Sequence, residues 1–402
     1  MKNWIIALLV IFSINLQAGN YNPDQPIQET VDSLLREARP LIDSDPSKAE
    51  ALINEALKIA EDGGFLKANA NALNYLGIIY YNQNEYPAAI KYFQRSLKVL
   101  FRIGNKEKVA NMMKKIGLSY LNQKKYNKAT EYYNLALKVF EQMEYPGRES
   151  TTRVELGVIY RLSQRYTDAV NQFEEAFSLY ESLDNKGGQA ESLHHIAKTY
   201  HLMGNFKKAD EYFSRTLKVY ENYLDYSGLA TIFNDYSQTL IELKQYQKAE
   251  EVLNLAEEQC SKSDTLLIGK ISANYGVVLV YQSEYERAEE YLNRALAVAK
   301  ELENKELLAQ VYRNLYEMNF RNNQTKKALA YYQKYIAVKD TTAVDAVKDY
   351  KSVESGEKLD NVIILITGFA SLAIIILVIW LIVVIRQRDR ALSEIKQWKS
   401  KS

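Results

Sequence analysis

The sequence predicts an all-α fold: an α-solenoid of about eight helical hairpins with a forty-residue period, followed by one transmembrane helix. Three observations predict it. Small and aromatic residues recur at a fixed interval, apolar residues within each interval are spaced as on one helix face, and a long uncharged run stands near the C-terminus. The composition agrees, because 47% hydrophobic and 25% charged residues among 402 are typical of a folded chain.

The interval is set by small residues and tyrosines that return in register. Nine residues before four of the alanines stands a tyrosine, and three residues before each tyrosine stands a glycine or alanine. The alanines are Ala49, Ala89, Ala129, Ala169, Ala209, Ala249, Ala288 and Ala328, the tyrosines are Tyr80, Tyr120, Tyr160 and Tyr200, and the small residues are Gly77, Gly117, Gly157 and Ala197. Such self-similarity indicates stacked copies of one structural unit.

Each unit contains two apolar stripes separated by a polar turn. In one unit the turn is Asn82-Gln83-Asn84-Glu85, so each unit is predicted to be a helical hairpin. An interior glycine weakens a helix by about 1 kcal/mol relative to alanine, so its regular return predicts close helix packing. Gly63-Gly64 and Gly187-Gly188 fall between units and are predicted helix ends.

The pattern resembles the tetratricopeptide repeat, whose signature is Leu-Gly, then Tyr, then Ala, an aromatic residue and Ala. One unit has Leu156-Gly157, Tyr160, Ala169, Phe173 and Ala176 in this order. The resemblance covers about residues 27–338 and implies a superhelix over residues 27–340. The period is longer than the usual thirty-four residues. The first and last units lack the Leu-Gly pair, as expected of capping units.

The two ends of the chain have a different composition. Residues 1–18 have the zones of a signal peptide, with an uncleaved signal anchor as the alternative, and residues 19–26 form a short N-terminal segment. Residues 341–361 are a predicted juxtamembrane helix, 362–385 a transmembrane helix and 386–402 a basic cytoplasmic tail. The predicted localisation is therefore the bacterial inner membrane, single-pass, with periplasmic repeats and a cytoplasmic C-terminus.

No residue pattern predicts a catalytic, cofactor-binding or metal-binding site, so the protein is predicted not to be an enzyme. His194 and His201 share a helix face, which leaves a metal site open beside the plainer interpretation of polar groove residues. Cys260 is predicted to be an apolar filler. A net charge of +1 argues against a nucleic-acid partner.

The resemblance implies that the first helix of each unit lines a concave groove in which peptides bind. The residues of this sequence that match the groove do not include the Lys/Asn set by which some family members clamp a C-terminal carboxylate. The positions of this sequence that match the groove are Asn71, Asn74, Tyr81, Asn111, Lys114, Leu118, Val154, Arg161, His194, Lys198, His201, Asn234, Gln238, Arg313 and Glu317.

The predicted function is a membrane-anchored periplasmic scaffold that binds a peptide or protein in this groove. The chain also resembles the outer half of Bacteroidetes envelope sensors, in which a repeat array precedes a membrane span. The alternative is therefore the sensor part of a signal-transduction receptor, of the histidine kinase or helix-turn-helix regulator type, lacking its output domain. The expected partners are a periplasmic protein or peptide, the membrane, and a cytoplasmic or membrane signalling partner.

Overall fold

The computed structural model describes residues 25–220 and 228–353, with side chains described up to residue 339. These residues form seventeen helices and no strand, which confirms the predicted all-α class. The helices are α2 (Gln25–Ala38), α3 (Leu41–Ser44), α4 (Pro46–Asp62), α5 (Leu66–Asn82), α6 (Tyr86–Ile103), α7 (Lys106–Asn122), α8 (Tyr126–Gln142), α9 (Pro146–Leu162), α10 (Tyr166–Ser182), α11 (Lys186–Leu202), α12 (Phe206–Tyr220), α13 (Leu229–Glu242), α14 (Tyr246–Gln259), α15 (Thr265–Tyr281), α16 (Tyr285–Glu301), α17 (Lys305–Arg321) and α18 (Thr325–Val353).

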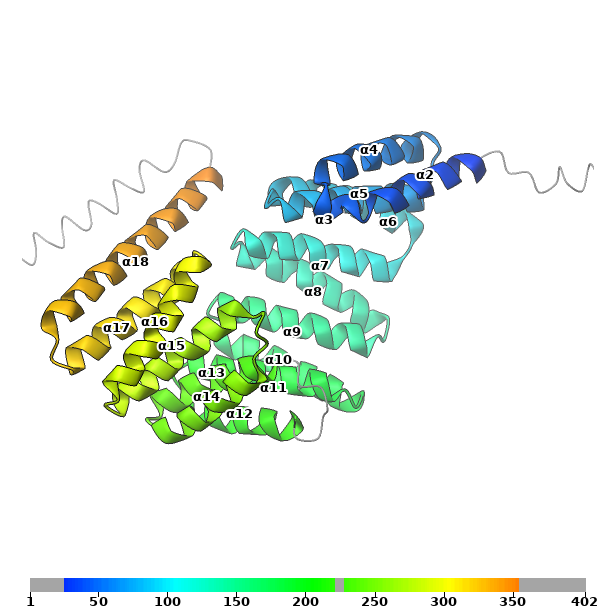
Figure 1. The fold of residues 1–402 in the computed structure, drawn as a ribbon. Helices are drawn as coiled ribbons and strands as arrows, with labels where there is room; N and C mark the ends of the chain where they lie inside the picture. Colours follow the sequence, from blue (N-terminus) through cyan, green and yellow to red (C-terminus); the bar gives the residue numbers. More distant parts are fainter. Residues whose placement is uncertain (1–24, 221–227, 354–402) are drawn as a thin grey trace, which may run out of the picture. The chain divides into compact units, whose positions relative to one another are not determined.

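The chain divides into two compact units, residues 1–267 and 268–402. In the first unit the hairpins follow one another from α2 and α4 to α13 and α14, blue to green in Figure 1, and the second helix of each contacts the first helix of the next. In the second unit α16 contacts α17, and α17 contacts α18. The sequence predicts one array over residues 27–340 and does not anticipate this division.

The recurring glycines lie where an aromatic ring of the second helix rests on the backbone of the first. A methyl group built on these glycines would lie 2.4 to 2.6 Å from a ring carbon, closer than any real contact allows. The pairs are Gly77 with Phe93, Gly117 with Tyr133, and Gly157 with Phe173. The rings are at most 3% exposed, so their burial compensates for the low helix propensity of glycine. The predicted close packing is confirmed.

Most of the turns between the described helices contain a residue in the left-handed region. The turn predicted at Asn82–Glu85 is confirmed, since α5 ends at Asn82, Asn84 has φ 62° and α6 begins at Tyr86. Gly64, with φ 69°, ends α4 as predicted.

The second predicted glycine stop is wrong. Gly187 and Gly188 lie in the first turn of α11, and the residue with positive φ before it is Asp184, at 49°. A Cβ on Gly188 would lie 2.4 Å from the Tyr180 ring, so this glycine serves packing and not chain reversal.

Within residues 25–220 and 228–353, no helix has both the length and the apolar character needed to cross a bilayer. This finding overturns, for the described part of the chain, the predicted single-pass localisation with periplasmic repeats and a cytoplasmic C-terminus. The predicted signal peptide (1–18), transmembrane helix (362–385) and tail (386–402) lie outside the described residues. Helix α18 continues to Val353 and crosses the predicted boundary at residue 340.

Candidate peptide-binding face

The first helices of successive hairpins in the first unit, α5, α7, α9, α11 and α13, are joined by polar contacts. We call the surface that they form the first-helix face. Lys115 Nζ donates to Asn74 Oδ1 at 2.6 Å, and Asn122 Nδ2 donates to the Tyr81 hydroxyl at 2.6 Å. The face is therefore polar and ordered by its own side chains.

Most of these contacts join residues that are 41 positions apart, one more than the period of the sequence. The Lys114 ammonium, for example, lies 2.6 Å from the Glu155 carboxylate. A predicted position in one unit therefore meets the side chain that follows the equivalent position in the next unit. This rule identifies partners that the groove prediction omits, namely Lys115, Asn122, Glu155 and Asp235.

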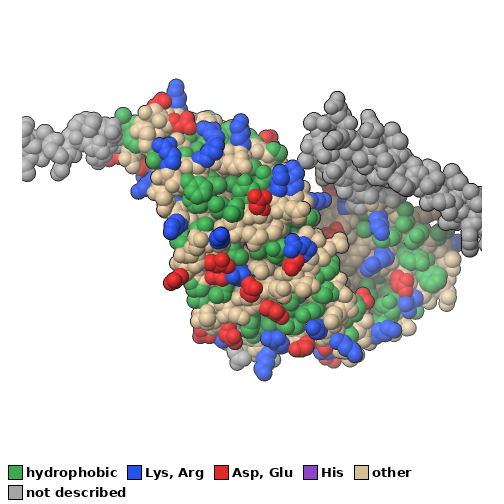
Figure 2. Space-filling model, turned by 180° about the vertical axis from the view of Figure 1, so that it is seen from behind, with side chains coloured by type: hydrophobic (Ala, Val, Ile, Leu, Met, Phe, Trp, Pro, Cys, Tyr) green, Lys and Arg blue, Asp and Glu red, His purple; other side chains and the backbone are tan. Residues whose placement is uncertain are grey.

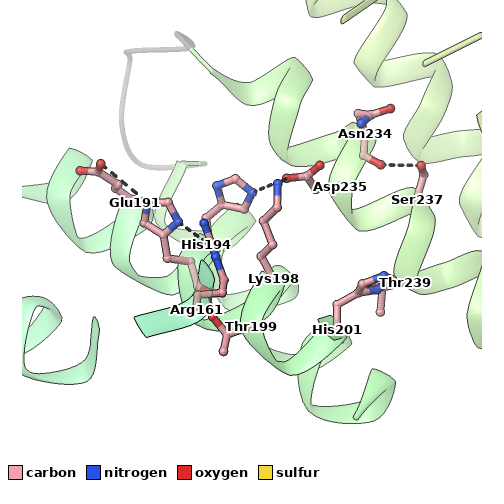
Figure 3. A network of polar contacts seen from close by, with 11 residues as sticks. Arg161, Glu191, His194, Lys198, Thr199, His201, Asn234, Asp235, Ser237 and Thr239 are labelled. Atoms are coloured by element: carbon pink, nitrogen blue, oxygen red, sulfur yellow. Dashed lines mark hydrogen bonds and ion pairs between the residues drawn. The ribbon is translucent and has the colours of Figure 1, made fainter. Parts of the chain in front are cut away.

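The densest part of the face is a group of charged and imidazole side chains on α9, α11 and α13 (Figure 3). We call Arg161, His194, His195, Lys198, His201 and Asp235 the α9–α13 network. The Asp235 carboxylate lies 3.1 Å from His194 Nε2 and 2.8 Å from Lys198 Nζ. His201 Nδ1 lies 3.0 Å from the Thr239 hydroxyl.

The Asp235 carboxyl is 11% exposed and is held ionised by its two neighbours. Burial alone would raise its pKa, but the hydrogen bond from His194 and the charge of Lys198 outweigh burial and depress the pKa strongly. This carboxylate therefore stays charged throughout the physiological range.

Arg161 and His195 form the other half of the network. Arg161 Nη1 lies 3.3 Å from His195 Nδ1, and the His195 ring stacks on Phe173 with ring centroids 5.0 Å apart. Because a guanidinium only donates, Nδ1 is the acceptor and the imidazole is neutral. Burial, followed by the charge of Arg161, lowers the pKa of His195 well below its usual value, which agrees with this assignment.

The predicted groove residues of the first unit fall into three groups according to the exposure of their side chains. Asn71 is exposed, whereas Val154 is 5% exposed and Asn234 is 2% exposed, so these two do not line an open surface. The half-buried residues are Asn74, Tyr81, Asn111, Lys114, Leu118, Arg161, His194, Lys198, His201 and Gln238. Asn71 and the half-buried set therefore keep surface that a ligand can reach.

Arg313 and Glu317 belong to the second unit, on α17. Arg313 is exposed, and Glu317 accepts a hydrogen bond from Arg321 Nε at 2.6 Å on the same helix. In this unit Gln310 Nε2 donates to Asn274 Oδ1 at 3.4 Å, so polar contacts between first helices recur there.

The geometry does not bring together a metal site in the described part of the chain, where no three His, Cys, Asp or Glu side chains are arranged to hold an ion. The histidines that left this question open point to Asp235 and Thr239 instead. On the side of the molecule drawn in Figure 2, Lys and Arg side chains are interspersed with Asp and Glu side chains. The arrangement offers hydrogen-bond donors and acceptors along a row of helices.

Stacked helical hairpins with a polar first-helix face define a helical repeat protein, and a profile of the tetratricopeptide repeat matches residues 68–142, 108–182, 148–222, 188–262 and 267–341. These matches span more than half of the chain, which therefore belongs to the tetratricopeptide repeat family. No curated protein matches the sequence.

Solved structures of several other proteins have a similar fold. Aspartyl phosphate phosphatase F from Bacillus subtilis is similar at 19% identity and TM-score 0.60, over 82% of this chain and 87% of that chain. The quorum sensor NprR from B. thuringiensis, in its apo form, is similar at 16% identity and TM-score 0.54, over 84% and 97%.

A third similar structure contains a peptide. The Rap conjugation gene regulator of the plasmid pLS20, in complex with the Phr* peptide, is similar at 14% identity and TM-score 0.53, over 82% of this chain and 98% of that chain. At these identities the likeness establishes the fold. The predicted resemblance to Bacteroidetes envelope sensors is not supported by these matches.

Proposed function

We propose that this protein is a binding protein without enzymatic activity, and that it holds a peptide or an extended protein segment on the first-helix face. The observation that carries the proposal is the row of half-buried polar side chains on α5, α7, α9, α11 and α13. An extended backbone presents donors and acceptors at regular intervals, which such a row complements. The Phr* complex of the pLS20 regulator, a protein of the same fold, supports a peptide ligand.

The alternative explanation is that these side chains only hold successive hairpins together. Two members of the row argue against it. Asn111 on α7 and Lys198 on α11 both keep an accessible surface, and the side chain of Lys198 is 40% exposed while it contacts Asp235. The contacts between hairpins hold these side chains in fixed positions before a ligand binds. Because such a preformed row loses little side-chain entropy on binding, contacts that stabilise the fold also favour recognition.

The test is a selection of random dodecapeptides displayed on phage against the full chain, followed by affinity measurements on the enriched peptides. We expect the Asn111→Ala/Lys198→Ala variant to bind them about ten-fold or more weakly. The matched control is Asn134→Ala/Lys138→Ala, two exposed positions on α8 with the same chemical change. Enriched peptides that bind both variants equally would contradict binding at the first-helix face. The scaffold and sensor roles both require this binding, so the experiment bears on each.

A further inference from the structure

Charges on the first-helix face differ in whether a carboxylate neutralises them. Lys114 is paired with Glu155 at 2.6 Å, and Lys198 is paired with Asp235 at 2.8 Å. A half-buried charge normally has such a partner, because removal from water is otherwise unfavourable.

Lys115 on α7 is an exception to this pattern. Its ammonium donates to Asn74 Oδ1 at 2.6 Å and lies 5.8 Å from the centre of the Phe93 ring. Among the described residues no carboxylate lies within ion-pairing distance of it. Burial lowers the pKa of Lys115, and no nearby negative charge compensates.

Arg161 on α9 is the second exception. Its only polar contact in the described part of the chain is with the neutral His195 imidazole, at 3.3 Å. The guanidinium also lies 5.9 Å from the centre of the Phe173 ring. Burial lowers the pKa of Arg161, and the opposing influence of Asp235 is smaller, since that carboxylate is already engaged by His194 and Lys198. Most of the five guanidinium donors are therefore left for a ligand.

These two cations share one construction. Each lies over the aromatic ring that the recurring glycine admits, Phe93 above Gly77 and Phe173 above Gly157. A ring face attracts a cation but does not satisfy its N–H donors in the plane. The construction thus holds a positive group in place, and each cation keeps N–H donors beyond its single hydrogen bond that another molecule can use.

Resting on the proposed function, we propose that the peptide bound at the first-helix face is acidic, and that its carboxylates occupy the unneutralised positions at Arg161 and Lys115. Arg161 receives a carboxylate through two parallel hydrogen bonds, and Lys115 receives one as a point charge. The carboxylate belongs either to an Asp or Glu side chain or to the C-terminus of the ligand.

The experiment compares the peptides selected by the full wild-type chain with those selected by Lys115→Met/Arg161→Met, which keeps the apolar stems. We expect Asp and Glu to be enriched only with the wild type, and the enriched peptides to bind the variant about ten-fold or more weakly. The control is Lys108→Met/Arg148→Met, which removes the same charges from exposed positions of α7 and α9. Remaking the best peptide with Gln for Glu, and separately with an amidated C-terminus, identifies which carboxylate binds.

Thermal unfolding of the free protein gives a second readout. Because the two cations are desolvated and neither is paired with a carboxylate, we expect the Met variant to melt no lower than the wild type. A large fall in melting temperature would assign the cations to the fold and overturn the inference. Peptides selected without any preference for Asp or Glu would also overturn it, while leaving the proposed function intact. If no peptide is selected at all, the proposed function fails first.

Discussion

Replacing Gly117 by leucine tests the packing that defines each hairpin. A Cβ at this position would lie 2.6 Å from Tyr133 Cδ2 and 3.3 Å from the Ala129 carbonyl oxygen. The ring is 3% exposed and the carbonyl belongs to the backbone of α8, so neither moves freely. Leucine adds three further carbons beyond that Cβ. We expect the substitution to destabilise the protein by about 1–3 kcal/mol, the usual range for overpacking a core.

The assay is chemical denaturation of the full chain followed by helical circular dichroism. The control is Gly147→Leu, since no atom lies within 4 Å of a Cβ at Gly147 in the first turn of α9. Gly117→Ala is an informative intermediate, because alanine already stands at the equivalent position, Ala197, in α11. An unchanged unfolding midpoint for Gly117→Leu would show that the ring does not rest on this glycine and would refute the packing argument.

Three further predictions concern turns and the α9–α13 network. Lys124 has φ 57°, so Lys124→Gly is expected to stabilise the protein by about 1 kcal/mol, whereas Lys138→Gly in the middle of α8 destabilises it by a similar amount in the same denaturation assay. Because the pKa of His195 is lowered on folding, the unfolded chain binds the extra proton, and stability falls as pH drops below about 6.5. Between pH 7 and pH 5 the free energy of unfolding of His195→Gln should therefore fall less than that of the wild type. An equal fall in the two proteins would contradict a buried neutral imidazole. The depressed pKa of Asp235 gives stability that is present above about pH 4 and is lost below it. Asp235→Asn should therefore be less stable than wild type by about 1–3 kcal/mol at pH 7, with a difference that shrinks in acid.

The fold was accessible from the sequence because the same residues carry both the pattern and the packing. Gly77 and Tyr80 are spaced as one helix face requires, and Phe93 stands where its ring meets that glycine. The turn residues were harder to predict, since Lys124 and Gln164 adopt positive φ at positions where glycine is expected. Their neighbours impose this conformation through the hairpin geometry, which is a tertiary effect that local preference does not reveal.

The site was predicted only in part, because contacts between repeats do not follow the period of the repeat. His194 was predicted as a groove residue, but its partner Asp235 lies 41 residues on and so falls one position outside the aligned set. Asn234, which does fall in the aligned set, is 2% exposed. The offset of one residue comes from how consecutive first helices pack against each other. The forty-residue period of the sequence does not reveal this offset.

The overall charge and the charge of the site lead to different conclusions, and the site is the better guide to the ligand. A net charge of +1 exerts no long-range pull, and at physiological salt exposed charges are screened beyond about 8 Å. Half-buried charges are screened much less, so recognition depends on which of them lack a counter-charge. Glu155 and Asp235 neutralise two cations of the first-helix face, and Lys115 and Arg161 remain. A nearly neutral protein can therefore select an acidic peptide through two positions, without attracting polyanions over its whole surface.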